Sequence, residues 1–180
     1  YVSATNAFYA LDLRTGELLW TASLPSENEF DFVSAPAYAQ GMLFMSVGQS
    51  FVALDSETGA LRWQVEKETY FYFSALGPSL AYVGNGDGFF YAYDLTTGEE
   101  MWKFAGGEEI WFGPAVTEDT VYVGHFNGFL YALDALTGEK RWEFATPHWA
   151  VSDAVVSAGI VSFTACNHDA PQQACHLYAL

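Results

Sequence analysis

The stretch Ala92-Tyr-Asp94-Leu-Thr-Thr97-Gly98-Glu-Glu-Met-Trp102 decides the fold, because its pattern recurs along the chain. The pattern Ala-x-Asp-x-x-Thr-Gly-x-x-x-Trp occurs four times and ends at Trp20, Trp63, Trp102 and Trp142. The copies follow one another at intervals of roughly 40 residues, and a fifth begins at Leu177. A repeat of this length indicates supersecondary units that bury their apolar faces by stacking on one another.

Each repeat has the pattern of a small β-sheet. Residues 121–123 and 129–133 are short runs of β-branched and aromatic residues, and the Gly- and Asn-containing segment 124–128 between them predicts a turn. The Asp-x-x-Thr-Gly segment predicts a second tight turn, because Gly adopts positive φ easily and Asp accepts hydrogen bonds from backbone amides two residues on. A strand that ends in the motif Trp follows. A fourth strand, such as 112–116 or 151–156, precedes each pair.

Four antiparallel strands in about 40 residues are typical of a β-propeller blade, so we predict an all-β propeller of four-stranded antiparallel blades. The chain holds about four and a half blades and forms either a partial propeller or half of a larger ring. We expect the remaining blades to come from the parent chain or from a second chain. The predicted blades span residues 1–24, 25–66, 67–105, 106–145 and 146–180.

The repeated motif resembles the tryptophan-docking motif of quinoprotein-type propellers, the PQQ-like repeat family. Within that family, the propeller lipoprotein of the outer-membrane barrel-assembly machinery is the most similar class. The resemblance implies that each Trp packs flat between blades, against the motif Ala and against the Gly of the neighbouring motif. An indole buries about 150–250 Å², so one Trp per blade is enough to hold neighbouring blades together. The implied docking residues are Ala10, Asp12, Gly16 and Trp20; Ala53, Asp55, Gly59 and Trp63; Ala92, Asp94, Gly98 and Trp102; and Ala132, Asp134, Gly138 and Trp142.

Composition indicates a folded, soluble domain with a strongly acidic surface. Of 180 residues, 51% are hydrophobic, and 22 acidic side chains against 6 basic ones give a net charge of −16. Because nucleic acids bind through Lys and Arg, this balance argues against a nucleic-acid partner and favours cationic ones. No apolar run approaches the roughly 18 residues that a transmembrane segment needs.

Acidic and aromatic residues gather in the segments that join the blades, directly before the innermost strand of each blade. These segments predict an acidic, aromatic mouth of the central channel, which would bind a protein or a cationic or amphipathic ligand. In the alternative interpretation, the acids are solvated loop residues and the aromatics complete the core. The candidate residues are Glu27, Glu29, Asp31, Glu66, Glu68, Tyr72, Glu108, Glu109, Trp111, His148 and Trp149.

Cys166 and Cys175 flank an expanded loop between two predicted strands, where a cross-strand disulfide would restrain the loop. A disulfide implies an oxidising compartment, the periplasm or the cell exterior. The alternative is a metal site with His168 and His176 as further ligands, but the spacing matches no recognised zinc pattern. We therefore expect a disulfide and no metal.

We expect a non-catalytic extracytoplasmic scaffold without a cofactor. No nucleophile elbow, phosphate-binding loop or zinc-protease motif occurs. The alternative, which the resemblance implies, is a fragment of an alcohol or sugar dehydrogenase that uses pyrroloquinoline quinone with calcium. Asp153 is the only acid within a predicted innermost strand, and a hydrogen-bonded structural role is the simpler interpretation for it.

Overall fold

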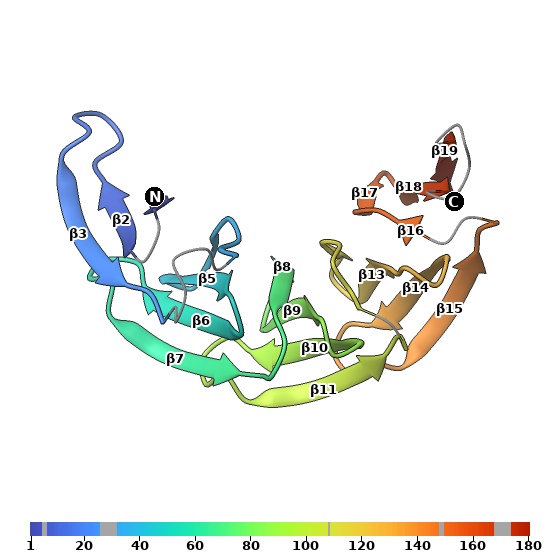
Figure 1. Cartoon of the computed structure of the whole chain (residues 1–180), viewed down its shortest axis with the longest axis horizontal. Coiled ribbons are helices and arrows are strands. Elements are labelled where there is room, and N and C mark those ends of the chain that lie inside the picture. Colours follow the sequence, from blue (N-terminus) through green and yellow to red (C-terminus); the bar gives the residue numbers. More distant parts are fainter. Residues whose placement is uncertain (5–6, 26–31, 108, 148–149, 168–173) are drawn as a thin grey trace. The chain divides into compact units, whose positions relative to one another are not determined.

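The computed structural model describes residues 1–4, 7–25, 32–107, 109–147, 150–167 and 174–180. Within these ranges every helix or strand is a β-strand, and the strands form five separate antiparallel sheets (Figure 1). The chain divides into two compact units, Tyr1–Phe71 and Tyr72–Leu180. No helix of the described ranges is long and apolar enough to cross a membrane.

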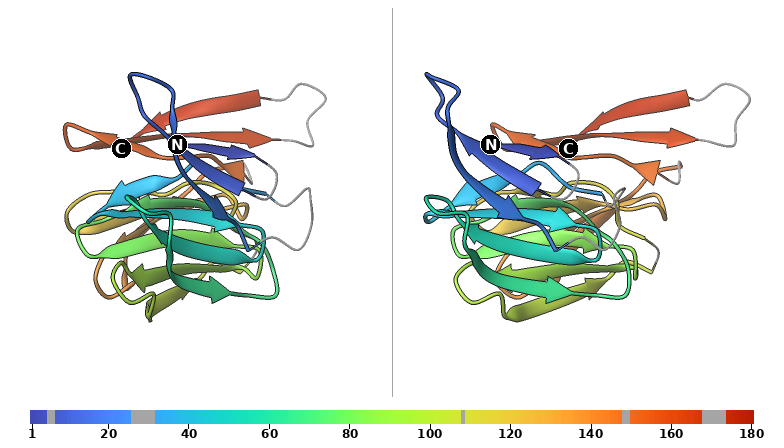
Figure 2. Two further views of the ribbon diagram at one scale, coloured as in Figure 1. Left: turned by 90° about the vertical axis from the view of Figure 1, so that its left-hand side faces the viewer. Right: turned by 60° about the vertical axis from the view of Figure 1, so that its left-hand side comes forward.

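The first unit contains one sheet of three strands and one of four. The three-stranded sheet consists of β1 (Val2–Ala4), β2 (Ala7–Leu11) and β3 (Leu18–Ser23). The four-stranded sheet consists of β4 (Ala37–Ala39), β5 (Met42–Val47), β6 (Ser50–Asp55) and β7 (Leu61–Glu66). In both sheets, strands adjacent in sequence are adjacent in space, as in a meander (Figure 2).

The second unit contains three sheets. The first is β8 (Phe71–Leu76), β9 (Leu80–Asn85), β10 (Phe89–Asp94) and β11 (Glu100–Ala105), and the second is β12 (Ala115–Val116), β13 (Thr120–Gly124), β14 (Phe129–Asp134) and β15 (Lys140–Ala145). The third is β16 (Ala150–Val151), β17 (Val155–Ser157), β18 (Ile160–Asn167) and β19 (Ala174–Ala179). These sheets confirm the predicted all-β chain of four-stranded antiparallel blades.

The hydrophobic core lies between neighbouring sheets. In the first unit, one cluster joins Phe8 and Ala22 of the first sheet to Leu43 and Val52 of the second. In the second unit, one cluster joins β9 and β10 to β13 and β14, and another joins Leu130 to Phe163 of β18. The middle strands are almost fully buried, whereas β7, β11 and β15 are largely exposed. Stacking therefore buries the apolar faces, as the repeat predicts.

The innermost strands are shorter than the sequence predicts. The segment 112–116 forms a strand only over Ala115–Val116, because Pro114 has no amide hydrogen and the amide of Gly113 donates to the Asp153 carboxylate. The segment 151–156 is divided into β16 and β17, which pair successively along one edge of β18. Ser152 keeps contact with β18 through its amide, which donates to the carbonyl of Thr164 at 2.8 Å.

Candidate functional site

The motif turns share one local structure. In each copy the motif Ala lies opposite the motif Trp across a hairpin, and the register shifts directly after the Ala. The Asp carboxylate then accepts hydrogen bonds from the amides two and three residues on, at 2.8–3.0 Å. The Gly adopts a positive φ of 72–73°. This self-contained turn fixes where its backbone carbonyls point.

Arginine side chains reinforce two of these turns. Arg141 donates to the carboxylates of Asp119 and Asp134 at 2.8 and 2.9 Å, and the hydrogen bond from Arg141 is the main reason that the pKa of Asp134 is lowered to about 2. In the first unit, Arg62 donates to Asp55 and holds the pKa of that carboxyl far below its ordinary value. Asp55 and Asp134 are hence ionised, partly buried members of structural turns.

Trp20 and Trp102 pack against the turn of the adjacent sheet in their own unit. The Trp20 indole N–H donates to the carbonyl of Ser56 at 3.2 Å, and the Trp102 N–H donates to the carbonyl of Ala135 at 3.0 Å. A Cβ atom at Gly59 would lie 2.5 Å from the Trp20 ring, and one at Gly138 would lie 2.6 Å from the Trp102 ring. Only Gly therefore allows the ring to lie this close to the turn.

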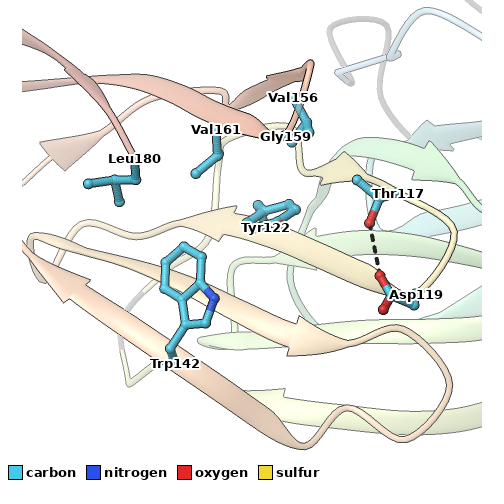
Figure 3. Close-up of a pocket in the computed structure, with 8 residues that line it drawn as sticks. All are labelled: Thr117, Asp119, Tyr122, Trp142, Val156, Gly159, Val161 and Leu180. Atoms are coloured by element: carbon cyan, nitrogen blue, oxygen red, sulfur yellow. Dashed lines mark hydrogen bonds between the residues drawn. The ribbon is translucent and has the colours of Figure 1, made fainter.

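Trp63 packs against Phe44 and Phe51 of its own sheet, with ring centroids 5.7 Å apart in both pairs. Trp102 packs in the same way against Tyr82 and Phe90 of its own sheet. Trp142 lines a cavity (Figure 3) and is 38% exposed, whereas Trp102 is only 9% exposed. The two motif tryptophans of the second unit therefore differ in burial.

Tyr72, Trp111, Phe112 and Phe126 form an aromatic patch in the second unit. Trp111 lies 5.7 Å from Tyr72 and 5.0 Å from Phe126 between ring centroids, and Phe112 lies 5.2 Å from Phe126. The Trp111 indole N–H donates to the Glu109 carboxylate, and Trp111 is 44% exposed. The patch therefore combines one exposed indole and three partly buried aromatic rings with a carboxylate.

The segment that carries Trp111 is anchored by its neighbour in sequence. Ile110 is fully buried in the core, and its amide donates to the carbonyl of Asn85 at 3.3 Å. A Cβ atom at Gly84 would lie 2.3 Å from the Ile110 carbonyl oxygen, so this close approach requires Gly. With Ile110 held inside, the adjacent Trp111 is placed at the surface.

The other sequence-predicted mouth residues are only partly described. In the first unit, the Gln64 amide donates to the Glu66 carboxylate, and the Gln49 side chain donates to the backbone carbonyl of Glu68. Tyr72, Glu109 and Trp111 come together in the second unit as the aromatic patch. The remaining candidates, Glu27, Glu29, Asp31, Glu108, His148 and Trp149, lie outside the described residues.

Sequence reasoning did not assign Phe112 and Phe126 to the site. Phe126 lies in the turn between β13 and β14, and its ring contacts both Trp111 and Phe112. The only sequence signal was an aromatic residue within the Gly- and Asn-containing turn 124–128. Asp153 accepts a hydrogen bond from the backbone amide of Gly113, which is the structural role expected for it.

A disulfide joins Cys166 and Cys175, which are directly opposite one another on β18 and β19. This confirms the predicted cross-strand bond; His168, a ligand in the alternative metal site, lies outside the described residues. Within the described ranges, no three His, Cys, Asp or Glu side chains are grouped to hold a metal ion.

Comparison with known proteins places these features in context. Residues 1–88 and 86–178 match a family described as outer membrane protein assembly factor BamB. The quinoprotein alcohol dehydrogenase PedE of Pseudomonas putida is 30% identical over 119 residues, which are 65% of this chain and 18% of PedE. The matched part of the chain therefore spans less than a fifth of the length of that relative.

Solved structures show the same fold. BamB from Moraxella catarrhalis has a TM-score of 0.67 and 20% identity to this chain, covering 82% of this chain and 47% of that one. The computationally designed Ika4 protein has a TM-score of 0.75 and 17% identity, covering 92% of this chain and 99% of that one. At these identities the likeness concerns the fold alone.

Proposed function

Since the chain belongs to the PQQ-like repeat β-propeller family of outer membrane protein assembly factor BamB, we propose that it is part of a non-catalytic extracytoplasmic scaffold. The scaffold binds a protein partner, or a cationic or amphipathic ligand, through its aromatic and acidic loops. The observation that carries this proposal is the aromatic patch around Trp111.

The composition of the patch favours binding over a purely structural role. Aromatic rings at the surface provide a large contact area with little loss of conformational freedom, and Trp and Tyr are enriched at the energetic centres of interfaces. A ring that only completed the core would be buried, yet Trp111 is 44% exposed. The Glu109 carboxylate beside it favours a partner that presents Lys or Arg next to an apolar side chain.

The extracytoplasmic location is supported by the disulfide. Disulfides persist in the periplasm and outside the cell, and they are rare in a reducing cytoplasm. The Cys166–Cys175 bond closes the loop between β18 and β19. Membership in a family described by an outer membrane protein assembly factor agrees with this location.

The test is the binding of a labelled basic amphipathic peptide, measured by fluorescence anisotropy. We expect Trp111→Ala to weaken binding about tenfold or more, because a central aromatic contact is worth at least about 1–2 kcal/mol. The matched control is Leu136→Ala, which removes an exposed side chain from a motif turn away from the patch residues. Equal affinity of the wild-type protein and the Trp111→Ala variant would exclude the patch as the binding surface.

A second candidate function is part of a quinone-dependent dehydrogenase, and the 30% identity to PedE favours it. The two candidate functions differ in whether the cofactor should stabilise the chain against unfolding. Pyrroloquinoline quinone with calcium should raise the unfolding temperature of an enzyme fragment that holds the cofactor. We expect no saturable shift for the scaffold. A shift that saturates at one quinone per chain would favour the enzyme.

A further inference from the structure

The turn between β13 and β14 carries a buried histidine next to one of the rings of the aromatic patch. His125 is fully buried, and it is followed by Phe126, whose ring lies 5.0 Å from Trp111 and 5.2 Å from Phe112 between centroids. The amide of Gly128 closes the turn by donating to the His125 carbonyl at 3.1 Å. Because His125 and Phe126 are adjacent in one tight turn, a rearrangement at the histidine also moves a ring of the patch.

The imidazole of His125 holds this turn as a hydrogen-bond acceptor. The amide of Asn127 donates to His125 Nδ1 at 3.0 Å, so the neutral ring carries its hydrogen on Nε2. The Asn127 side chain continues the turn, since its oxygen accepts from the amide of Phe129 at 3.1 Å and its nitrogen donates to the Tyr131 hydroxyl at 2.8 Å. A proton on Nδ1 would make that nitrogen a donor that faces the donor of Asn127, and their hydrogen bond would be lost.

The surroundings of the ring prevent it from turning away from this amide. A Cβ atom at Gly106 would lie 2.3 Å from Nε2 and 2.4 Å from Cδ2 of His125, so the imidazole lies directly against the Gly106 backbone. The Tyr131 ring meets the imidazole edge-on, with 6.2 Å between centroids. Since a buried charge is costly without solvent, a proton reaches Nδ1 only when the turn opens to water.

The titratable side chains of the segments packed against His125 have partners of their own. On β14, the Tyr131 hydroxyl accepts from the Asn127 side chain, and on the segment 106–110 the Glu109 carboxylate accepts from the Trp111 indole. Glu108 of that segment lies outside the described residues. Among the described side chains of these segments, histidine is the type that changes its charge between about pH 5 and about pH 8.

The preceding repeat contains the same turn with asparagine in place of the histidine. Asn85 is also fully buried, and its side-chain oxygen accepts from the amide of Asp87 at 2.9 Å. The Asp87 carboxylate then accepts from the amide of Phe89 at 3.0 Å and from the Tyr91 hydroxyl. An asparagine therefore supplies the acceptor that the turn needs, and a histidine at this position adds sensitivity to pH.

We propose that His125 makes binding at the aromatic patch depend on pH, with the partner bound while the imidazole is neutral and released when it is protonated. This inference rests on the proposed function, because it concerns the same patch. In the open turn the imidazole is in water and takes up a proton with the ordinary histidine pKa of about 6.5. The closed turn is therefore fully favoured above about pH 6.5 and loses stability as the pH falls below it. Opening moves Phe126 away from Trp111 and Phe112, and the patch loses part of its contact surface.

The first measurement needs no partner. Hydrogen exchange of the amides in residues 124–129 is followed by mass spectrometry on the whole chain at about pH 7.5 and about pH 5.0, with each rate divided by its intrinsic value. Uptake of one proton by the open turn favours opening by up to about 30-fold over this interval, so we expect protection to fall by roughly 10- to 30-fold. The segment 85–89, with Asn85 in the equivalent place, is an internal control whose protection should not change. Equal protection of residues 124–129 at the two pH values would overturn the proposal.

The second measurement is the affinity for the labelled basic amphipathic peptide at the same two pH values and constant ionic strength. We expect the Kd of the wild-type protein to rise at least about threefold at the lower pH, because the binding-competent fraction falls. In His125→Asn, which keeps the acceptor and every acid of the chain, the ratio of the two Kd values should stay near one.

The outcomes separate this proposal from the proposed function. An equal loss of affinity in the wild-type protein and in His125→Asn would assign the pH effect to other groups and overturn the role of His125. Tight binding with the same Kd at both pH values would also overturn it, while the proposed function would stand. Failure of the peptide to bind at the higher pH would overturn both.

Discussion

At the scale of single residues, the motif Trp contributes an aromatic ring and a hydrogen-bond donor. Its contribution to the stability of the fold depends on whether the ring packs against protein atoms or faces solvent. Trp102 is buried and bonded to Ala135, whereas Trp142 is 38% exposed and lines a cavity. These two positions allow the docking role of the motif Trp to be tested within one unit.

We expect Trp102→Ala to lower the free energy of unfolding by about 3–5 kcal/mol, because it removes a buried indole and leaves a cavity. Trp142→Ala should cost roughly 1–2 kcal/mol, since much of its ring is already in contact with water. Urea unfolding followed by circular dichroism measures both. A cost below about 1 kcal/mol for Trp102→Ala would show that the docking role is wrong.

The ionised Asp134 makes the stability of the fold depend on pH in the acidic range. Its pKa is lowered from 3.8 to about 2 by the hydrogen bond from Arg141, so the stabilisation is present above pH 3.8 and is lost as the pH falls through about 2. We expect the urea midpoint to fall less steeply over this range in Asp134→Asn, which can still accept the turn hydrogen bonds but lacks the charge. Identical pH profiles for the two proteins would contradict this assignment.

The resemblance predicts that each Trp lies against the Gly of the neighbouring motif, and Gly59 and Gly138 do lie against Trp20 and Trp102. It does not predict that a Tyr hydroxyl donates to the same carbonyl as the indole. Tyr1 and Tyr82 lie outside the eleven-residue motif, Tyr1 directly before β1 and Tyr82 within β9, where alternation along a strand indicates only whether a residue is buried or exposed. Hydrogen bonds between sheets depend on how sheets stack, and a local pattern does not contain that information.

At the scale of elements, the motif turn requires Gly for two separable reasons, backbone conformation and space. Gly16 and Gly138 have nearly the same φ, 73° and 72°. A Cβ atom at Gly16 would have no atom within 4 Å, whereas one at Gly138 would collide with Trp102. A substitution at these two glycines therefore meets the same backbone conformation but different amounts of space, so the two turns form a matched pair for mutation.

We expect Gly16→Ala to cost about 1–2 kcal/mol, the penalty of placing Ala at positive φ. Gly138→Ala should cost about 1–3 kcal/mol more, because the indole must move away from the added carbon. Chemical denaturation of the two variants gives the difference directly. Equal costs would mean that the Trp102 ring does not pack against this turn.

The disulfide stabilises the β18–β19 hairpin through the loop that it closes. With a sequence separation of nine between the two cysteines, the loss of chain entropy in the unfolded state predicts a stabilisation of about 2–3 kcal/mol. We expect protein made in an oxidising compartment to carry the bond in its intact mass, and the Cys166→Ser, Cys175→Ser double variant to unfold at a lower urea concentration. Two free thiols, or one zinc ion per chain, in that material would reject the assignment.

The limits of strand prediction have a local cause. The apolar run at 121–123 correctly predicts a middle strand, because β13 is largely buried on both faces and is rich in β-branched and aromatic residues. The innermost strands are less predictable. There, a side chain can replace a backbone partner, as the Asp153 carboxylate does for the amide of Gly113.

At the scale of the whole molecule, the repeat predicts the blades, but it does not show which surface binds a partner. Charge and aromatic content pointed to the segments between blades, and Tyr72, Glu109 and Trp111 come together there. The contribution of Phe112 and Phe126 depends on the approach of a turn from a different hairpin. Contacts between such distant segments arise from tertiary packing and leave little trace in a single repeat.

The central claim is that the acidic and aromatic loops bind a cationic or amphipathic partner, and it is tested most directly by the salt dependence of binding. Clustered negative charges attract cations, and salt screens this attraction over about 10 Å at 0.1 M. The titration uses a labelled basic peptide across a series of ionic strengths, with two sets of Glu→Gln substitutions. One set is Glu66, Glu68, Glu108 and Glu109; the other is Glu17, Glu57, Glu99 and Glu139 in the motif turns.

We predict that binding by the wild-type protein weakens steeply with salt, and that neutralising the first set removes both the affinity and its salt dependence. Neutralising the second set should change neither appreciably, although it removes the same total charge. Equal losses from the two sets would contradict the account. In that case only the overall charge of the chain attracts the peptide, and the loops between blades form an ordinary solvated surface.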